Sequence, residues 1–243
     1  TYSYVRDTEY YEIHTNLMDG NLDGRTDLPA YFGRAWQYAE RDDGLRYRPA
    51  PEFHFIYTVC HLAKHLYGGG AGLRMYLDAA LFVKQEDARL DWAAIMEEFS
   101  ALHLTAFFHT VMNACRVWFG TETACPLPEP DHAALEKLLD YTLDADLFGL
   151  SRDHAVIELR NEREAAPSRG RVLRRMLFPP AAEIETRYTF LKGRRWLLPV
   201  AWIVRPFANL RLIPAQLRQM KQVTKTDRAQ VEAYDSFMRE IGL

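Results

Sequence analysis

The feature that most constrains this chain is an apolar stretch that a run of glycines interrupts. The segment FHFIYTVCHLAKHLY (53–67) is apolar on most faces of a helix, GGGAG (68–72) follows, and LRMYLDAALFVK (73–84) resumes helical spacing. Glycine costs about 1 kcal/mol relative to alanine inside a helix, so this glycine-rich run ends one. The sequence therefore predicts two successive helices, about 52–67 and 73–84, and a core that is mainly helical.

Apolar residues at helical spacing recur on both sides of this pair. Asp27 and Asp91 each stand directly before such a run, and the short acidic side chain of Asp is favoured at helix N-caps. Pro29 falls in the first turn after Asp27, where proline is tolerated. The proline-rich segment TACPLPEP (123–130) indicates a loop. We expect further helices over the ranges 28–41, 91–99, 103–119 and 130–147.

Only the first residues have the composition of β-strands. Tyr2–Val5 and Tyr10–Asn16 are rich in aromatic and β-branched residues, and RDTE lies between them, which predicts a hairpin. Two strands alone are marginally stable in water, and the chain starts at Thr1 rather than at a methionine. We therefore expect the rest of a sheet upstream. The predicted fold class is α+β and mostly α-helical: an N-terminal hairpin left from a larger sheet, followed by a multi-helix domain.

Composition narrows the function classes. The chain has 243 residues, enough for one large or two small domains, and its net charge of −3 argues against an overall attraction to nucleic acid or membrane. Its three cysteines, Cys60, Cys115 and Cys125, form no CxxC pair and no even framework, which favours a reducing, cytoplasmic location. The apolar stretch WLLPVAWIV (196–204) is about half the ~20 residues that span a bilayer. The oligomeric state is left open.

A stripe of histidine and lysine runs along the helix predicted over 52–67. His61, Lys64 and His65 are spaced i, i+3, i+4 and share one face, and His54 lies two turns earlier on about the same face. One interpretation is a partly exposed polar edge. A second is an anion site, in which Lys64 and the histidines hold phosphates with Arg74 nearby.

A third interpretation of the same stripe is a metal site. Two histidines at i, i+4 with a carboxylate such as Asp78 would suit zinc or iron. Lys64 argues against this interpretation, because its positive charge would repel the metal ion. In the anion interpretation, Asp78 instead orients the lysine or Arg74.

The predicted hairpin adds one acidic residue. In YYEIHTNL, Glu12 and His14 point to the same face of the strand because side chains alternate, and Tyr10 joins them. A carboxylate on the working face of a sheet could hold magnesium. A solvent-facing strand residue is the simpler interpretation.

The loop MDGNLDGRTDLPA (18–30) has the alternating oxygen ligands and the glycine of the first half of an EF-hand calcium loop. It fails at the twelfth position, where a bidentate glutamate is required and Ala30 stands instead. Asp, Asn and Gly also favour ordinary turns. We therefore interpret 18–30 as a connector and leave calcium binding open.

The stretch 190–225 contains eight Lys or Arg and no Asp or Glu. A membrane-surface helix and a polyanion-facing patch are two functional interpretations. Prolines at 199, 206 and 214 interrupt any long amphipathic helix. We favour a packed helix whose arginines extend to solvent.

Several of these segments together resemble the uncharacterised nucleotidyltransferase family, a branch of the DNA polymerase β-like nucleotidyltransferases. The order of strand acid, HxxKH helix, LxxxxDAAL helix and DW helix carries the resemblance, and a late LFP…LLPVAW stretch adds to it, so that it runs over nearly the whole chain. The resembling segments are YEIHTNL (11–17), FIYTVCHLAKHLYGGGAGLRMYLDAALFV (55–83), LDWAAIMEEF (90–99) and RRMLFPPAAEIETRYTFLKGRRWLLPVAWIVR (174–205).

The resemblance implies a polymerase β-like sheet followed by a helical domain, and transfer of a nucleoside monophosphate from an NTP to an acceptor with two magnesium ions. It places Glu12 where the family has a third catalytic, metal-binding acid. It places Lys64, with His61 and His65, where a cation of the helical domain meets the triphosphate. Asp78 takes the place of an acid that orients this cation. The acceptor and the base of the NTP are left open.

The family signature itself, a Gly-Ser turn followed by Asp-x-Asp or Asp-x-Glu on a strand, does not occur in this chain. We therefore expect residues 1–27 to be the end of the nucleotidyltransferase sheet, 28–149 a helical domain, and 150–243 a helical extension with the basic stretch. We also expect that this chain alone does not catalyse transfer. Two alternatives are a non-catalytic binding or scaffold module, and a helical metalloprotein that uses His61, His65 and Asp78.

Overall fold

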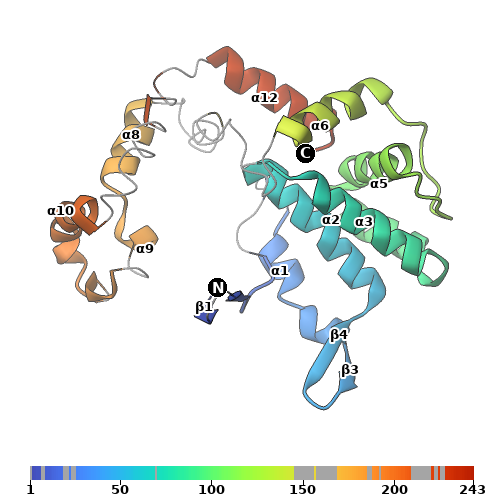
Figure 1. The fold of residues 1–243 in the computed structure, drawn as a ribbon, viewed down its shortest axis with the longest axis horizontal. Helices are drawn as coiled ribbons and strands as arrows, with labels where there is room; N and C mark the ends of the chain where they lie inside the picture. Colours follow the sequence, from blue (N-terminus) through green and yellow to red (C-terminus); the bar gives the residue numbers. More distant parts are fainter. Residues whose placement is uncertain are drawn as a thin grey trace. The chain divides into compact units, whose positions relative to one another are not determined.

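The chain divides into two compact units, Thr1–Ser151 with Phe237–Leu243, and Arg152–Ser236, in a computed structural model (Figure 1). The three expected segments, 1–27, 28–149 and 150–243, stay a prediction. The structure describes residues 2–6, 9–18, 22, 26–68, 70–144, 156, 169–184, 188–191, 193–208, 220–221, 224 and 228–243.

The first unit opens with the predicted hairpin. Strands β1 (Tyr2–Arg6) and β2 (Glu9–Ile13) pair antiparallel, with Ser3 opposite Glu12. Within the described residues this sheet has two strands. The α+β, mostly helical class is therefore confirmed, with the hairpin at the N-terminal end and the helices after it.

The helix expected over 28–41 is much shorter than predicted. Helix α1 spans Leu28–Phe32, and the predicted cap is present, because the backbone N–H of Ala30 donates to Asp27 Oδ1 at 3.0 Å. A 3₁₀ turn, η1 (Ala35–Tyr38), follows.

A second hairpin then begins where the last residues of the expected helix were predicted. It pairs β3 (Ala39–Asp43) with β4 (Arg46–Pro49). Gly44 stands at its turn with φ +53°, a left-handed conformation that glycine adopts without steric cost. The Asp-Gly turn signal therefore prevailed over helical spacing.

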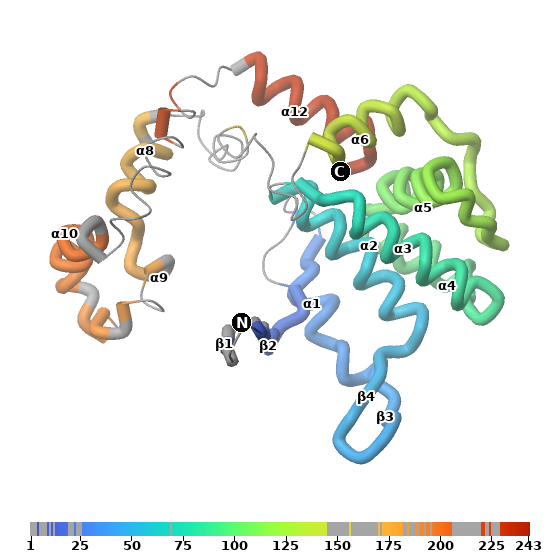
Figure 2. The backbone as a smooth tube through the Cα atoms, viewed as in Figure 1, coloured from blue at the N-terminus to red at the C-terminus, as the bar shows by residue number. Residues whose placement is uncertain are grey.

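The remaining helices of this unit agree with the prediction, and the glycine break separates α2 from α3 as expected. The helix α3 packs against both α2 and α5, as Figure 2 shows. Large side chains with less than 2% exposure, including Phe55, Phe99 and Phe108, fill the space between them. The bounds are α2 (Pro51–Gly68), α3 (Leu73–Glu86), α4 (Trp92–Ala101), α5 (Thr105–Phe119) and α6 (His132–Asp144).

Two acidic residues fix the ends of these helices. Asp91 caps α4 as predicted, accepting from Ala94 N at 3.0 Å. Asp87, in the 3₁₀ turn η2 (Asp87–Arg89), accepts from Trp92 Nε1 at 3.1 Å and from Thr123 Oγ1 at 2.5 Å. Asp87 thereby ties the loop after α5 to the end of α3.

The chain end returns to the first unit. Helix α12 (Arg228–Glu240) finishes there, and Lys137 Nζ of α6 donates to Glu240 Oε1 at 2.6 Å. A Cβ on Gly242, whose φ is +91°, would lie 2.3 Å from Phe107 N. Only glycine permits this close approach of the C-terminus to α5.

The second unit has a small apolar core of its own. Ile184, Tyr188, Leu191 and Ala201 are buried together, and Trp202 packs against them. Its elements are α8 (Arg169–Leu177), α9 (Ala181–Ile184), η3 (Thr189–Leu191), η4 (Arg195–Leu197) and α10 (Leu198–Ala208).

Helix α10 lies within the basic stretch 190–225. It is anchored to α8, because Arg205 donates to Met176 O at 2.8 Å. The same helix leaves Ile203 67% exposed. The three interpretations of 190–225 stay predictions. None of the helices among the described residues is both long enough and apolar enough to cross a bilayer.

Candidate functional site

Helix α2 brings the predicted stripe together. The ring nitrogens His61 Nε2 and His65 Nε2 lie 3.2 Å apart, and the ring planes meet at 86°. A hydrogen bond at this distance needs one imidazole to donate and the other to accept, so at least one ring must be neutral. The i, i+4 spacing on a regular helix produces this contact directly.

Both imidazoles resist protonation. The pKa of His61 is lowered to about 4, first by burial and then by the charges of His65, Lys64 and His14. Burial and the charge of Lys64 also lower the pKa of His65. At neutral pH the stripe therefore carries the charge of Lys64 and two neutral imidazoles. One ring donates its single N–H to the other ring, so the accepting ring keeps the N–H that is free for a ligand, on Nδ1.

Lys64 is half-buried beside these rings. It forms no ion pair with any carboxylate in the part of the chain that the structure describes. Water solvates a partly buried ammonium group incompletely. Binding of an anionic group therefore stabilises such an ammonium group more than it would a fully exposed one. The stripe is therefore chemically suited to an anionic group.

Arg74 and Asp78 lie on the exposed side of α3. Arg74 Nε lies 3.8 Å from Asp78 Oδ2, and the two side chains are 80% and 56% exposed. Of the two cations that Asp78 was predicted to orient, the structure pairs it with Arg74.

Glu12 lies on β2 at the register position opposite Ser3. Its side chain, and that of Tyr10, lie outside the described residues, so the predicted shared face with His14 stays a prediction. His14 follows the strand, is exposed, and lies close enough to His61 for its charge to lower that pKa. A residue after the hairpin thus acts on the stripe of α2 through its charge. Spacing along the helix could not reveal this long-range approach.

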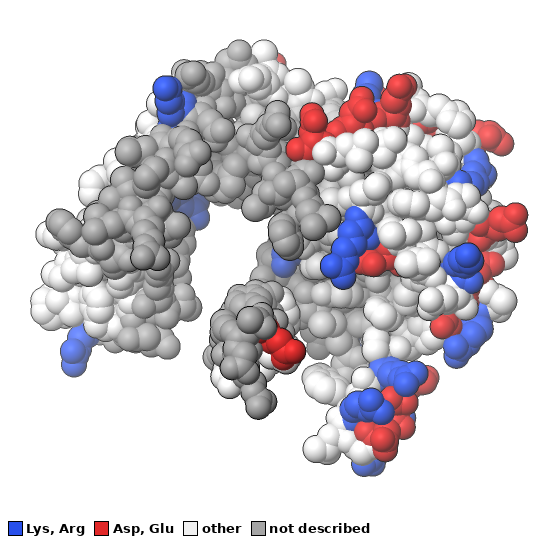
Figure 3. Space-filling view, viewed as in Figure 1, with Lys and Arg blue, Asp and Glu red and all other residues white. Residues whose placement is uncertain are grey.

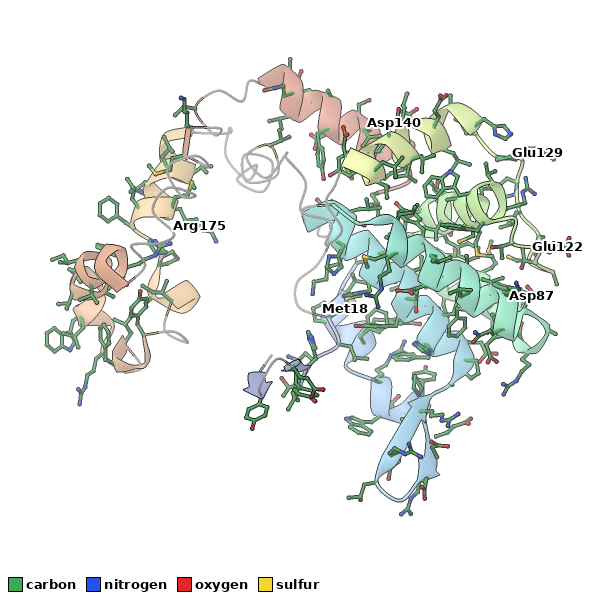
Figure 4. All side chains as sticks on the ribbon, viewed as in Figure 1. Met18, Asp87, Glu122, Glu129, Asp140 and Arg175 are labelled. Atoms are coloured by element: carbon green, nitrogen blue, oxygen red, sulfur yellow. The ribbon has the colours of Figure 1, made fainter. Side chains whose placement is uncertain are left out.

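The sequence prediction missed a cavity beside the stripe. It measures about 420 Å³ and lies between the residues after β2, the segment from α1 to β3, and the end of β4. His14 and Met18 line it, and Figure 4 labels Met18. The other lining residues are Thr15, Asn16, Leu17, Pro29, Phe32, Gly33, Ala35, Trp36, Ala39, Tyr47, Arg48, Pro49 and Phe53.

Aromatic rings connect this cavity to the stripe. Phe32 lines the cavity and meets Tyr57 edge to face at 5.6 Å between ring centroids. Tyr57 in turn stacks on His61 at 5.4 Å and 12°. Phe32 and Tyr57 thus form a chain of ring contacts that leads from the cavity to His61 of the stripe.

The alternative metal site finds no support in the structure. Among the described residues, which include His61, His65 and Asp78, no three or more His, Cys, Asp or Glu side chains are grouped so that they could hold a metal ion. Asp78 instead pairs with Arg74 on its own helix.

In the calcium-like loop, Asp19, Asn21 and Asp23 lie outside the described residues. Asp27, the last acid of this pattern, serves as the N-cap of α1. Thr26 donates to Leu102 O at 2.5 Å and is buried. The end of the loop is thus tied to the helices, which is what a connector requires.

The comparisons agree with the family that the sequence resembles. The uncharacterised nucleotidyltransferase family matches residues 1–120, which include both hairpins, the stripe, the cavity and helices α1 to α5. The match ends before the segment 174–205, so the resemblance of that segment stays a prediction. No curated protein and no solved structure matches the chain.

Proposed function

We propose, from the match of residues 1–120 to the uncharacterised nucleotidyltransferase family, that this chain binds an NTP as part of nucleotidyl transfer to an acceptor. In such a transfer an acceptor oxygen bonds to the α-phosphorus and pyrophosphate leaves. The protein mainly positions the reactants and offsets the charge of the phosphates.

The observation that carries the proposal is the stripe of His61, Lys64 and His65 inside the matched region. It offers one cation without an ion pair, in the part of the chain that is described, and one imidazole N–H that the contact between His61 and His65 leaves free to donate. A triphosphate needs both kinds of partner. Arg74 is proposed as an outer contact, and Asp78 as the residue that orients it.

The low pKa values of the two histidines should make nucleotide binding at the proposed site depend on pH. The charges around His61 that lower its pKa are positive, and a bound phosphate would oppose them. We expect His61 or His65 to take up a proton as the nucleotide binds. Affinity should therefore increase as the pH falls from 8 to 6.

We also propose that Mg²⁺ takes part in nucleotide binding. Glu12 would supply one carboxylate ligand for it from β2. The described residues do not complete a magnesium site, because no group of three or more suitable side chains occurs among them. Since the chain also lacks the Gly-Ser turn and its acidic pair, we propose nucleotide binding, and not transfer, for this chain on its own.

Thermal unfolding with each of the four NTPs and Mg²⁺ tests the proposal. A ligand at one hundred times its Kd stabilises the folded state by about 2.7 kcal/mol, so one NTP should raise the Tm by several degrees. Lys64→Ala should remove the shift. Lys84→Ala, the same change at an exposed residue of α3, is the matched control and should keep it.

A non-catalytic binding or scaffold module is the competing function. It predicts that no NTP changes the Tm of the chain. That result would overturn the proposed binding of an NTP to this chain.

A further inference from the structure

We propose that the cavity beside β2 binds a planar, uncharged aromatic ring of a small-molecule ligand. This inference rests on the proposed function and names the part of the substrate that the stripe on α2 does not hold. The ring is either the base of the nucleotide or a ring of the acceptor.

The size and the walls of the cavity suit a single ring system. Ligand pockets commonly enclose about 300–1,000 Å³, and this one measures about 420 Å³. Phe32 and Phe53 line it and are 2% and 3% exposed, so they form a fixed apolar floor. They meet edge to face at 5.5 Å, an arrangement that holds both rings in place.

The rim of the cavity carries a pair of aromatic side chains that are exposed and do not belong to the core. Trp36 is 77% exposed and Tyr47 is 49% exposed, and their rings meet at 5.6 Å and 87°. Both line the cavity. Exposed aromatic faces at the mouth of an apolar cavity gain free energy when a planar ring covers them.

The charges at the rim cancel one another. Arg48 Nε lies 3.0 Å from Asp42 Oδ2, and Arg46 lies 3.7 Å from both Asp42 and Asp43. Positive and negative residues accordingly intermingle on the β3–β4 hairpin in Figure 3. Arg48, which lines the cavity, is therefore already paired with a carboxylate, so this wall favours an uncharged ring over a phosphate.

Aromatic contacts connect the cavity to the stripe. Phe32 lines the cavity and meets Tyr57, and Tyr57 stacks on His61. His14 also lines the cavity. In this proposal the cavity holds the apolar part of a ligand and the stripe holds its anionic part.

Binding of uncharged ring compounds tests the cavity separately from the phosphate site. Isothermal titration calorimetry is run with adenosine, guanosine, cytidine and uridine, with indole and tyrosinamide, and with ribose as a compound without an aromatic ring. Trp36→Ala should weaken the binding of a ring compound about tenfold, the loss expected when one stacking partner is removed. Trp196→Ala is the matched control, because Trp196 is also 77% exposed.

If a nucleoside binds and indole and tyrosinamide do not, the cavity holds the base of the nucleotide. If indole or tyrosinamide binds and no nucleoside does, the cavity holds a ring of the acceptor. Both outcomes support the proposal if Trp36→Ala weakens binding and Trp196→Ala does not. The proposal is overturned if no ring compound binds, if ribose binds equally well, or if Trp36→Ala has no effect. Lys64→Ala should leave ring binding unchanged, so a failed phosphate site and a failed cavity are distinguishable.

Discussion

Two faces of helix α2 differ in polarity and in the role of their side chains. One face carries Phe55, Val59 and Leu62, which are 0% exposed and hold the helix in the core. The other carries His61, Lys64 and His65, where burial, and after it the charge of Lys64, lowers the pKa of both imidazoles. The same helix thus separates residues that stabilise the fold from residues that are costly to keep there. Groups that a fold keeps at such a cost are candidates for function.

The largest expected effect is the loss of stability from a substitution in the apolar face of α2. Phe55 meets the rings of Phe82, Trp92 and Phe108. Phe55→Ala should lower the free energy of unfolding by about 3–5 kcal/mol, because the cavity left behind cannot close. Urea unfolding measures it. His54→Ala, next in sequence but exposed, should cost far less. Equal losses would contradict the separation of the two faces.

The next effect concerns binding and leaves stability nearly unchanged. Lys64→Ala should weaken binding of the preferred NTP at least about tenfold, the loss expected for a charge-assisted contact to phosphate. Urea unfolding of the same variant should give a free energy of unfolding close to that of the wild type. A large loss of stability would mean that Lys64 belongs to the fold and not to the site.

The third effect is a dependence of stability on pH. Because the pKa of His61 is lowered to about 4 when the chain is folded, protons bind more readily to the unfolded chain below pH 6.5. Stability from this residue is complete above pH 6.5 and is lost as the pH falls toward 4. His61→Gln should flatten that part of the profile, as measured by urea unfolding at successive pH values. An unchanged profile would contradict the assigned cause.

The smallest effect is at Arg74. Its ion pair with Asp78 is long and solvent-exposed, so Arg74→Ala should change stability by only about 0.3 kcal/mol. A modest loss of NTP affinity with this variant would extend the site onto α3. No change in affinity would restrict the site to α2.

Much of the fold could be predicted from local signals. The caps Asp27 and Asp91 and the glycine break before Leu73 act within a few residues, and the structure has them where expected. The second hairpin was missed because the residues before it have helical spacing. The dipeptide Asp43-Gly44, a strong turn signal, was the available clue.

The candidate site was predictable only in part, because local sequence signals determine some of its contacts and long-range packing determines the others. The i, i+4 spacing of His61 and His65 implies their contact, and the structure has it at 3.2 Å. The approach of His14 and the cavity around Trp36 depend on how distant segments pack. No local pattern encodes such packing, because it depends on the whole core.

Calorimetric titration of the chain with each NTP and Mg²⁺ tests the central claim most directly. The account predicts that at least one NTP binds with one-to-one stoichiometry, more tightly at pH 6 than at pH 8, and that Lys64→Ala loses this binding while Lys84→Ala keeps it. If no NTP binds, or if Lys64→Ala binds as the wild type does, the stripe on α2 is not a nucleotide site.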